Sequence, residues 1–531
     1  MRATNMTKAI SNWRPIPAAA ALMLLAATAF AAAPGITGPN FKLTAQTAYL
    51  NTPDGSAIYS WGYGCNGTPS GFAPSAITTA TCPTMQVPGP TLIVTEGQTV
   101  TVQLTNNLPT SAGNTSILFP GFKVTTTGGV IGLLTQEAAP GGTVTYSFTA
   151  SSPGTRSYYS GTQGDLQVEM GLYGAIIVLP SSVPTACTSG LPLANTQVEA
   201  AHGEKDFRLS QAAYDHAKTC YDREYLFQFA EMDPVIHNQA RLQVAATLGC
   251  TAGAQGCSLE VPTEPYHPAY YLINGRAMPD LMDANYGAEY PHQPYNGNPH
   301  MHPGEITLIR VIGQGRWQHP FHEHANHVRI LARDANLLLS QSDPTLLAGL
   351  LMFTTDTTPG QAFDGLFYVT GKGLNWDMYG HNPTSSDPLA NVACVPDTNG
   401  YYTVNSSPPA PVSAINYFEW CQDHNKPIQA SPFGDVESGG PITLPDANIF
   451  TNGPWYNGSP YLGPDATVRA TGPLSVFQPS NSQANPANER GYAYMWHSHN
   501  EREITTNNVF PGGMLMMLLV DSREFVIDES M

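Results

Sequence analysis

The sequence predicts an all-β protein built from two related β-sandwich domains, the second of which carries a long loop insertion. Two observations support this prediction. The chain of 531 residues is dominated by short runs rich in Val, Ile, Thr, Tyr and Phe, which are broken by Pro and Gly. The chain also repeats its pattern of runs once, over a length that corresponds to a whole domain.

The clearest strand-like runs lie near the N-terminus: PTLIVTEGQTVTVQLTNNLP (90–109), GGTVTYSFTA (141–150) and YGAIIVLP (173–180). Alternating or short continuous apolar runs bounded by turn residues are typical of antiparallel sandwiches. Helical periodicity is weak. The best candidates for helices are residues 209–219 and 336–352.

Each run of the first copy has a partner in the second. The paired segments are 94–107 with 301–315, 116–124 with 319–331, 140–148 with 359–369, and 157–178 with 495–520. We therefore predict an N-terminal domain over 37–180, a connecting segment over 181–220 and a C-terminal domain over 221–531. The second domain contains an insertion at about 371–488 that is rich in Pro, Asn, Ser and Gly.

Residues 1–33 are expected to form a secretory signal peptide. Arg2, Lys8 and Arg14 precede an apolar run over residues 18–30, and small residues follow it. The run is shorter than the roughly 20 apolar residues that a membrane span needs. No later stretch is apolar enough to span a membrane. We therefore expect an exported protein, periplasmic or extracellular, without a membrane span.

Charge and cysteine content limit the function further. The formal net charge is −18, and loss of the signal peptide would make the chain more negative, so nucleic-acid binding is not expected. An even number of cysteines in an exported chain predicts disulfides. Pairing of sequence neighbours would give 65–82, 187–220, 250–257 and 394–421, although eight cysteines allow roughly a hundred connectivities.

Two His-x-His pairs are the strongest chemical signal in the sequence. His322 and His324 lie in HPFHEHANH (319–327), and His497 and His499 lie in MWHSHNERE (495–503). Side chains two positions apart on a strand point to the same face. Two such pairs on neighbouring strands would bring four imidazoles together, and neutral imidazole binds copper, zinc, iron or nickel.

The alternative interpretation of each histidine is a packed or solvated side chain. Secondary candidates for metal ligands are His319, His327 and Glu503. His300 and His302, in NPHMHPGE, are expected in a solvated turn. The carboxylates Glu169, Glu231 and Asp233 show no pairing in the sequence. Motifs for serine hydrolases, phosphate-binding loops, HExxH proteases and c-type haem are absent.

At these residues the sequence resembles the multicopper oxidase family, the laccase-like cupredoxin proteins. PGPTLIVTEGQTVTVQLTNNLP (88–109) is similar to the family's opening strands, and YLINGRAMPD (271–280) to the entry of a later domain. HPFHEHANH looks like the third copper motif and HSHNERE like the fourth. The resemblance implies two cupredoxin-like Greek-key domains. It is greatest to the two-domain members, which implies a homotrimer.

Departures from the family's pattern decide what the resemblance implies for copper. The first two motifs fall on LFPG and YSG, so Leu118, Pro120, Tyr159 and Gly161 occupy four histidine positions. The resemblance therefore implies that this chain alone lacks a complete trinuclear cluster. His322, His324, His497 and His499 match the cluster ligands that the C-terminal domain contributes.

The type 1 copper position is also altered. Ser498 stands where the family has the cysteine thiolate, and Glu503 where it has a histidine. Blue copper needs the soft thiolate, which a serine hydroxyl does not replace. His319, which matches the other type 1 histidine, is then expected to be a structural or hydrogen-bonding residue.

Carboxylates and tyrosines could complete the histidine set. Glu323, Glu501 and Glu503 lie near the histidines in sequence, and the resemblance places Tyr158 and Tyr159 near them in space. Glu323 and Glu501 could equally face solvent. Four histidines can hold one metal ion, or two with water or carboxylate ligands.

Three functions fit this sequence. The first is an oxidoreductase that holds copper, or another transition metal, on the four histidines and acts on a small molecule or a metal ion. The second is a non-catalytic structural or binding protein. The third is a protein that sequesters or delivers copper. The sequence leaves the substrate, the number of ions and the role of the insertion open.

Overall fold

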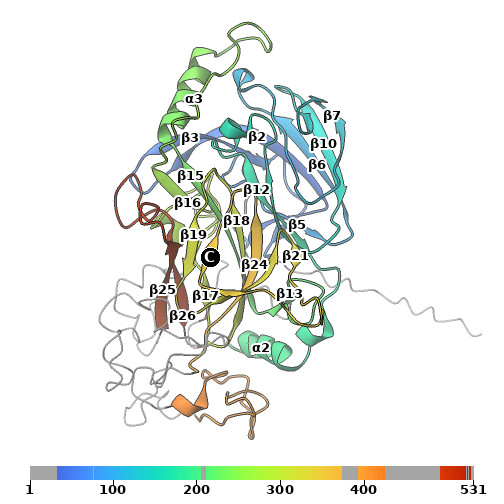
Figure 1. The fold of residues 1–531 in the computed structure, drawn as a ribbon, viewed down its shortest axis with the longest axis vertical. Coiled ribbons are helices and arrows are strands. Elements are labelled where there is room, and N and C mark those ends of the chain that lie inside the picture. The colour runs from blue at the N-terminus through green and yellow to red at the C-terminus, as the bar shows by residue number, and fades with distance from the viewer. Residues whose placement is uncertain are drawn as a thin grey trace, which may run out of the picture.

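A computed structural model describes residues 33–75, 77–204, 211–372, 393–424, 491–521, 523 and 526–527. Over these residues the protein is mostly β, with several sheets and a few short helices (Figure 1). The all-β prediction is confirmed at that level. The predicted signal peptide, apart from its last residue, and most of the predicted insertion lie outside the described residues.

The N-terminal part forms two five-stranded sheets, in the orders β3-β2-β6-β10-β7 and β11-β12-β5-β1-β4. The strands are β1 (Gly35–Thr37), β2 (Asn40–Asn51), β3 (Ala57–Cys65), β4 (Phe72–Ala73), β5 (Leu92–Thr95), β6 (Thr99–Asn106), β7 (Thr125–Gly128), β10 (Thr143–Thr149), β11 (Gly154–Tyr159) and β12 (Tyr173–Leu179). A small hairpin pairs β8 (Val130–Ile131) with β9 (Gln136–Glu137). In β6, Val100, Val102 and Leu104 alternate with threonines and are buried, as the period of two predicts.

The C-terminal part forms a seven-stranded sheet, β16-β15-β18-β24-β20-β21 with β22 on β20, and a five-stranded sheet, β17-β26-β25-β19-β23. The strands of the first are β15 (Arg223–Met232), β16 (Tyr270–Ile273), β18 (Ile306–Gly313), β20 (Val328–Arg333), β21 (Asn336–Leu337), β22 (Leu351–Met352) and β24 (Ala362–Tyr368). Those of the second are β17 (His300–Met301), β19 (Pro320–Glu323), β23 (Thr354–Asp356), β25 (Gly491–Ser498) and β26 (Leu515–Asp521). Phe227, Phe321, Trp496 and Leu518 lie in the core between these strands. A further two-stranded pair joins β13 (Gln211–Ala212) to β14 (Cys220–Tyr221).

The two parts pair their strands in the same way. β2 pairs parallel with β6 as β15 does with β18, and β6 pairs antiparallel with β10 as β18 does with β24. β5 pairs parallel with β12 as β17 does with β26, and β11 pairs with β12 as β25 does with β26. The repeat read from the sequence therefore has a counterpart in the strand pairing. The predicted domain boundaries stay a prediction.

The helices lie in other segments than predicted. They are α1 (Gly164–Gln167), α2 (Gly190–Ala201) and α3 (Pro234–Ala246), with 3-10 turns η1 (Thr110–Ala112), η2 (Thr185–Cys187), η3 (Asp280–Met282) and η5 (Cys421–Asp423). Residues 336–352 contain β21 and β22, and residues 211–219 contain β13 and a turn, so both helix predictions are wrong. Leu337 and Leu347 pack against the buried cluster around Leu331, and this packing outweighs the helical spacing. Asp233 caps α3 by accepting from Val235 N at 2.8 Å, and Pro234 occupies the first position of the helix.

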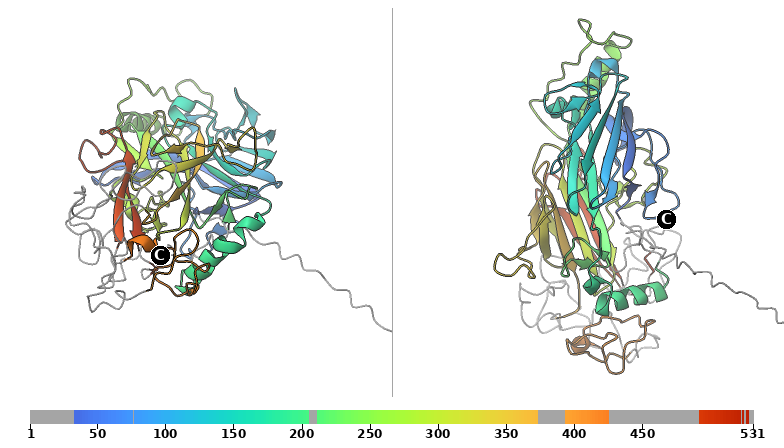
Figure 2. Two further views of the ribbon diagram at one scale, coloured as in Figure 1. Left: turned by 60° about the horizontal axis from the view of Figure 1, so that its bottom comes forward. Right: turned by 90° about the vertical axis from the view of Figure 1, so that its right-hand side faces the viewer.

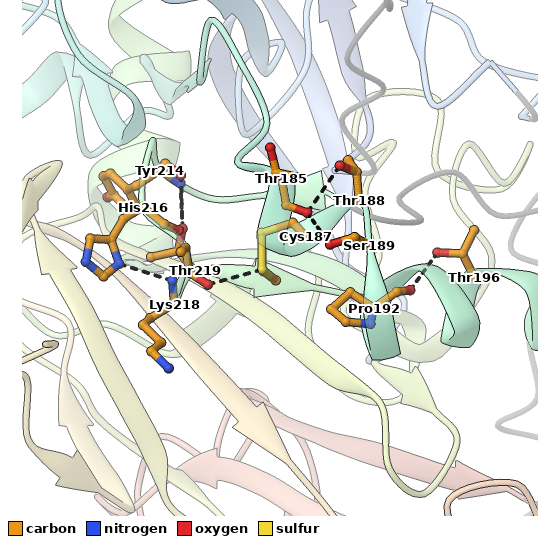
Figure 3. The surroundings of a disulfide bond; sticks show 12 residues. Thr185, Cys187, Thr188, Ser189, Pro192, Thr196, Tyr214, His216, Lys218 and Thr219 are labelled. Carbon is orange, nitrogen blue, oxygen red and sulfur yellow. Dashed lines mark hydrogen bonds between the residues drawn. A yellow bond between two sulfur atoms is a disulfide. The ribbon is translucent and has the colours of Figure 1, made fainter. Parts of the chain in front are cut away.

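All eight cysteines form disulfides, and each pairs with its sequence neighbour as predicted: 65–82, 187–220, 250–257 and 394–421. Figure 3 shows the surroundings of the bond at Cys187. Four disulfides indicate an oxidising environment, which agrees with export. In the described part of the chain, each helix is too short or too polar to cross a membrane.

The turn at Asn274–Gly275 gives a first testable prediction. Both residues have positive φ, 53° and 81°, and a Cβ on Gly275 would overlap the carbonyl oxygen of Val87. Backbone strain alone costs roughly 1–3 kcal/mol. We expect Gly275→Ala to lower the free energy of unfolding by more than this, because the overlap with Val87 adds to the strain. Gly253→Ala is the control, because Gly253 has a similar φ of 77° but open space around it. Equal losses for both variants in urea unfolding would contradict the role assigned to Val87.

Candidate metal centre

Two neighbouring strands position the predicted histidines. His322 on β19 lies directly opposite His497 on β25 in an antiparallel pair. His324 lies two positions after His322 and His499 two positions after His497, so each lies just beyond the end of its strand. Figure 1 shows β25 and β26, in red, on the side of the molecule near β19. Because side chains on a strand alternate, each His-x-His pair points to one face.

Three of the histidines come close together. Ring nitrogens of His322, His324 and His497 lie within 4.8 Å of one another, and all three side chains are buried. His324 Nε2 is 3.3 Å from His497 Nε2. The ring centre of His322 lies 4.9 Å from that of His324 and 5.5 Å from that of His497.

His499 lies at the open side of this cluster. Its ring centre is 4.9 Å from that of His322 and 5.4 Å from that of His497. Its side chain is 53% exposed, and its Nδ1 lies 3.4 Å from Glu501 Oε1. The structure therefore groups all four rings, three in the interior and one at the solvent boundary.

The contacts of His497 determine which of its ring nitrogens carries the lone pair. His497 Nδ1 lies 2.7 Å from the carbonyl oxygen of Ser498, which can only accept, so Nδ1 carries the hydrogen and Nε2 the lone pair. His322 Nδ1 lies 2.6 Å from Thr354 Oγ1. Burial lowers the pKa of His497, which favours the neutral imidazole that metal binding requires.

The donor set fits a transition metal. Two imidazole nitrogens, each about 2.0–2.1 Å from one ion, stand about 3.3 Å apart at a tetrahedral angle. The observed Nε2···Nε2 distance of 3.3 Å agrees with that value. Neutral imidazoles suit copper as well as zinc. A second close group, Cys394 with Glu419 and His424, offers no thiolate, because Cys394 is bonded to Cys421.

The structure places the secondary candidates away from a shared ligand position. His327 is buried with its ring 5.1 Å from that of Phe353. Glu323 is fully buried on the face of β19 opposite the histidines, so it is neither a neighbour of their rings nor exposed to solvent. It accepts a hydrogen bond from Thr355 Oγ1 at 3.2 Å. Burial raises the pKa of Glu323 well above its usual value. Glu501 is exposed, as the solvent alternative predicted.

His319, Ser498 and Glu503 form a buried polar network where the resemblance places type 1 copper. Ser498 Oγ donates to Glu503 Oε2 at 2.5 Å, and His319 Nδ1 lies 2.9 Å from the same oxygen. His319 Nε2 donates to Glu231 Oε2 at 2.9 Å. Both ring nitrogens of His319 thus face carboxylates, and all eight cysteines are in disulfides, so this position has neither a thiolate nor an open imidazole.

The sequence showed no pairing for Glu169 and Glu231, but the structure places Glu231 against His319 and links it to Glu169 through Tyr266. Glu231 accepts from the backbone N–H groups of Arg316 and Trp317 at 2.7 and 2.8 Å, and Tyr266 Oη bridges it to Glu169. Burial, together with the nearby charge of Glu231, raises the pKa of Glu169 to about 8. The available signal was two acidic residues, Glu224 and Glu231, inside the otherwise apolar strand REYLFQFAEM, where a buried charge needs a partner.

The N-terminal positions that lack histidines are filled by packing. Leu118 and Tyr159 pair through their backbones, and a Cβ on Gly161 would press against the side chain of Leu118. Pro120 is half-buried beside them. Tyr158 lies in the N-terminal core, where its hydroxyl donates to Pro90 O.

His300 and His302 are not in a solvated turn, so that expectation is wrong. Both side chains are fully buried. His302 Nε2 lies 3.2 Å from Glu204 Oε1 in a cluster that also contains Arg223 and Glu305. β17 lies beside β26 in the sheet, which carries this segment into the interior.

Comparison with known proteins finds a family match in the N-terminal part of the chain. Residues 73–183 match the family model described as multicopper oxidase. This stretch of the chain is similar to the multicopper oxidase family. The matched range contains the four N-terminal positions without histidines and ends before His322, so the match does not include the candidate metal ligands.

Two curated relatives match this chain over segments of 98 and 96 residues. Laccase abr2 of Aspergillus fumigatus is 36% identical over 98 residues, and the L-ascorbate oxidase of Brassica rapa subsp. pekinensis is 38% identical over 96 residues. Each match covers 18% of this chain and only 16% of the relative. Among solved structures, the blue copper oxidase from Nitrosomonas europaea and the multicopper oxidase mgLAC are each 14% identical, with TM-scores of 0.42. The first match covers 91% of this chain and 85% of that one, and the second 91% and 86%.

Proposed function

We propose that this is an exported multicopper-oxidase-like protein that binds copper on His322, His324 and His497, with His499 as a fourth ligand at the open side. In this proposal the protein is an oxidoreductase that acts on a small molecule or a metal ion without a type 1 copper. Bound copper would supply one-electron redox chemistry. The protein would supply the ligands, and Thr354 and the carbonyl of Ser498 would orient two of the rings.

The observation that carries the proposal is the grouping of three buried imidazoles with ring nitrogens within 4.8 Å of one another. Imidazole nitrogens that converge at this spacing can ligate one transition-metal ion together. The family supports copper as that ion, and the missing thiolate supports the absence of a type 1 site.

The exposure of His499 favours a second candidate function. A ligand that is 53% exposed and stands beside the exposed Glu501 gives an ion a route between solvent and the buried rings. Such an arrangement suits a protein that stores or delivers copper without turnover.

Metal analysis of the full-length protein from copper-supplied cells tests the metal proposal. We expect at least one copper per chain, an EPR signal with nitrogen couplings, and no intense blue absorption, because the thiolate that produces it is missing. A preparation that contains no copper and takes up none on titration would contradict the proposal. An intense blue colour would contradict the absence of the type 1 site.

Oxidation assays separate the two candidate functions. Oxidation of a phenol, Mn(II) or Cu(I) by the copper-loaded protein, lost in the His322→Ala variant, would support the oxidoreductase. Copper binding without turnover of any of these, together with transfer of the ion to a chelator, would support storage or delivery.

A further inference from the structure

A second site lies between α2 and the seven-stranded sheet, apart from the histidines. A cavity of about 220 Å³ is lined there by side chains of α2, β14, β18 and β24 and by the segment 393–424. Figure 1 and the right panel of Figure 2 show α2 at the lower end of the molecule. None of the residues that line this cavity is a histidine, so it is distinct from the candidate metal centre.

The helix that covers the cavity is held in place covalently. The Cys187–Cys220 disulfide joins η2, just before α2, to β14 on the cavity wall (Figure 3). Ser189 Oγ, at the start of α2, donates to Thr185 O at 2.7 Å. A fixed cover means that the cavity is formed before any ligand arrives, which lowers the entropic cost of binding.

The walls are mainly apolar and aromatic. Leu191 and Pro192 of α2 face Ile306 and Leu366 of the sheet, and Tyr221, Tyr368 and Phe418 add three rings. Phe418 packs directly over Gly304, where a Cβ would overlap the Phe418 side chain, so glycine is required there for the ring to lie against the wall. Flat aromatic walls favour a flat ring as the ligand.

Two polar groups interrupt this apolar lining. Asn195 is only 6% exposed, and its Oδ1 has no hydrogen-bond partner among the described residues. Asp222 is 4% exposed, and its Oδ2 accepts from Ile306 N at 2.7 Å. Burial raises the pKa of Asp222 to about 7. The amide of Asn195 offers a ligand hydroxyl one hydrogen bond, which contributes about 0.5–1.5 kcal/mol.

We propose that this cavity binds a small neutral aromatic alcohol, with the ring between the apolar walls and the hydroxyl on the amide of Asn195. A closed cavity of about 150 Å³ holds benzene, so 220 Å³ has room for a ring with a short hydroxyl-bearing arm. An anionic ligand is disfavoured because apolar walls desolvate its charge and Asp222 stands on the wall. The proposal is independent of the metal centre.

Saturation-transfer NMR with the full-length protein tests the proposal, with benzyl alcohol, toluene and benzoate as probes. We expect benzyl alcohol to bind about tenfold more tightly than toluene, because it gains one hydrogen bond to a buried group. Benzoate is expected to bind at least tenfold more weakly than benzyl alcohol. In Asn195→Ala the affinity for benzyl alcohol should fall to that for toluene, while toluene is unaffected.

A second variant tests the location. Leu191→Trp, at a half-buried position on α2, should block the cavity and abolish binding of both benzyl alcohol and toluene. Copper content and the thermal unfolding midpoint should stay at the wild-type value in both variants. The proposal is overturned if benzyl alcohol does not bind, if it binds no more tightly than toluene, or if neither variant changes its affinity.

Discussion

Replacement of His497 by alanine is expected to lower the affinity for copper by more than about 100-fold, because loss of a group that only hydrogen-bonds to a metal ligand typically costs up to about that factor. His497 contributes the Nε2 atom that lies 3.3 Å from His324 Nε2, near the centre of the cluster. Burial lowers the pKa of His497, which keeps this ring neutral to a lower pH than a free imidazole. Competition with a chelator of known copper affinity measures the change.

His267→Ala is the matched control, because His267 is exposed and its backbone N–H, rather than its ring, makes the hydrogen bond to Asp233 Oδ2. Its copper affinity should equal that of the wild type. His499→Ala should give an intermediate loss, because that ring lies at the solvent boundary. Equal affinities for the wild type and the His497→Ala variant would contradict a site built on these histidines.

The network around His319 is expected to stabilise the fold by about 3 kcal/mol at neutral to mildly acidic pH and to lose this contribution in alkali. Burial alone would lower the pKa of His319, but the hydrogen bonds and charges of Glu231 and Glu503 outweigh burial and raise the pKa to about 9. Since the folded pKa lies above the unfolded value of 6.5, the contribution is complete below pH 6.5. It is lost as the pH rises through about 9.

Urea unfolding of the wild type and of His319→Gln at several pH values measures this contribution. Glutamine leaves Glu231 and Glu503 without their cation, so the variant should be less stable by roughly 3–5 kcal/mol at pH 6. The difference between the two proteins should shrink toward pH 10. Other groups that titrate in alkali, such as Glu169, are common to both proteins and cancel in the difference. A difference that is constant with pH would show that His319 is not held as a cation.

The same network explains how the type 1 position can lack a metal and remain folded. A buried serine, histidine and glutamate would each cost free energy if left alone. Here Ser498 donates to Glu503, and the imidazolium of His319 lies between Glu503 and Glu231. Hydrogen bonds and ion pairs therefore satisfy these side chains at the position where the multicopper oxidase family, which this sequence resembles, ligates the type 1 copper.

Several features could be predicted from residues close together in the sequence. The alternation in β6 gives its buried face, the two His-x-His spacings give two pairs of imidazoles that each share a face, and neighbouring cysteines form the four disulfides. Each of these depends on strand periodicity or on short loops. The helix predictions failed where packing outweighed local spacing, as at residues 336–352.

By itself, the sequence predicted that the chain is mostly β, that its even number of cysteines forms disulfides, and that the side chains within the His322–His324 and His497–His499 pairs each share one face. Only the tertiary structure decided that the two pairs meet, that Glu231 reaches His319 from 88 positions away, and that a cavity lies beneath α2. The physical reason is range. Within one strand, the period of two determines the face to which each side chain points. The order of the strands in the sheets and the packing of the sheets determine which of these faces come together, and how far each buried charge lies from its partner.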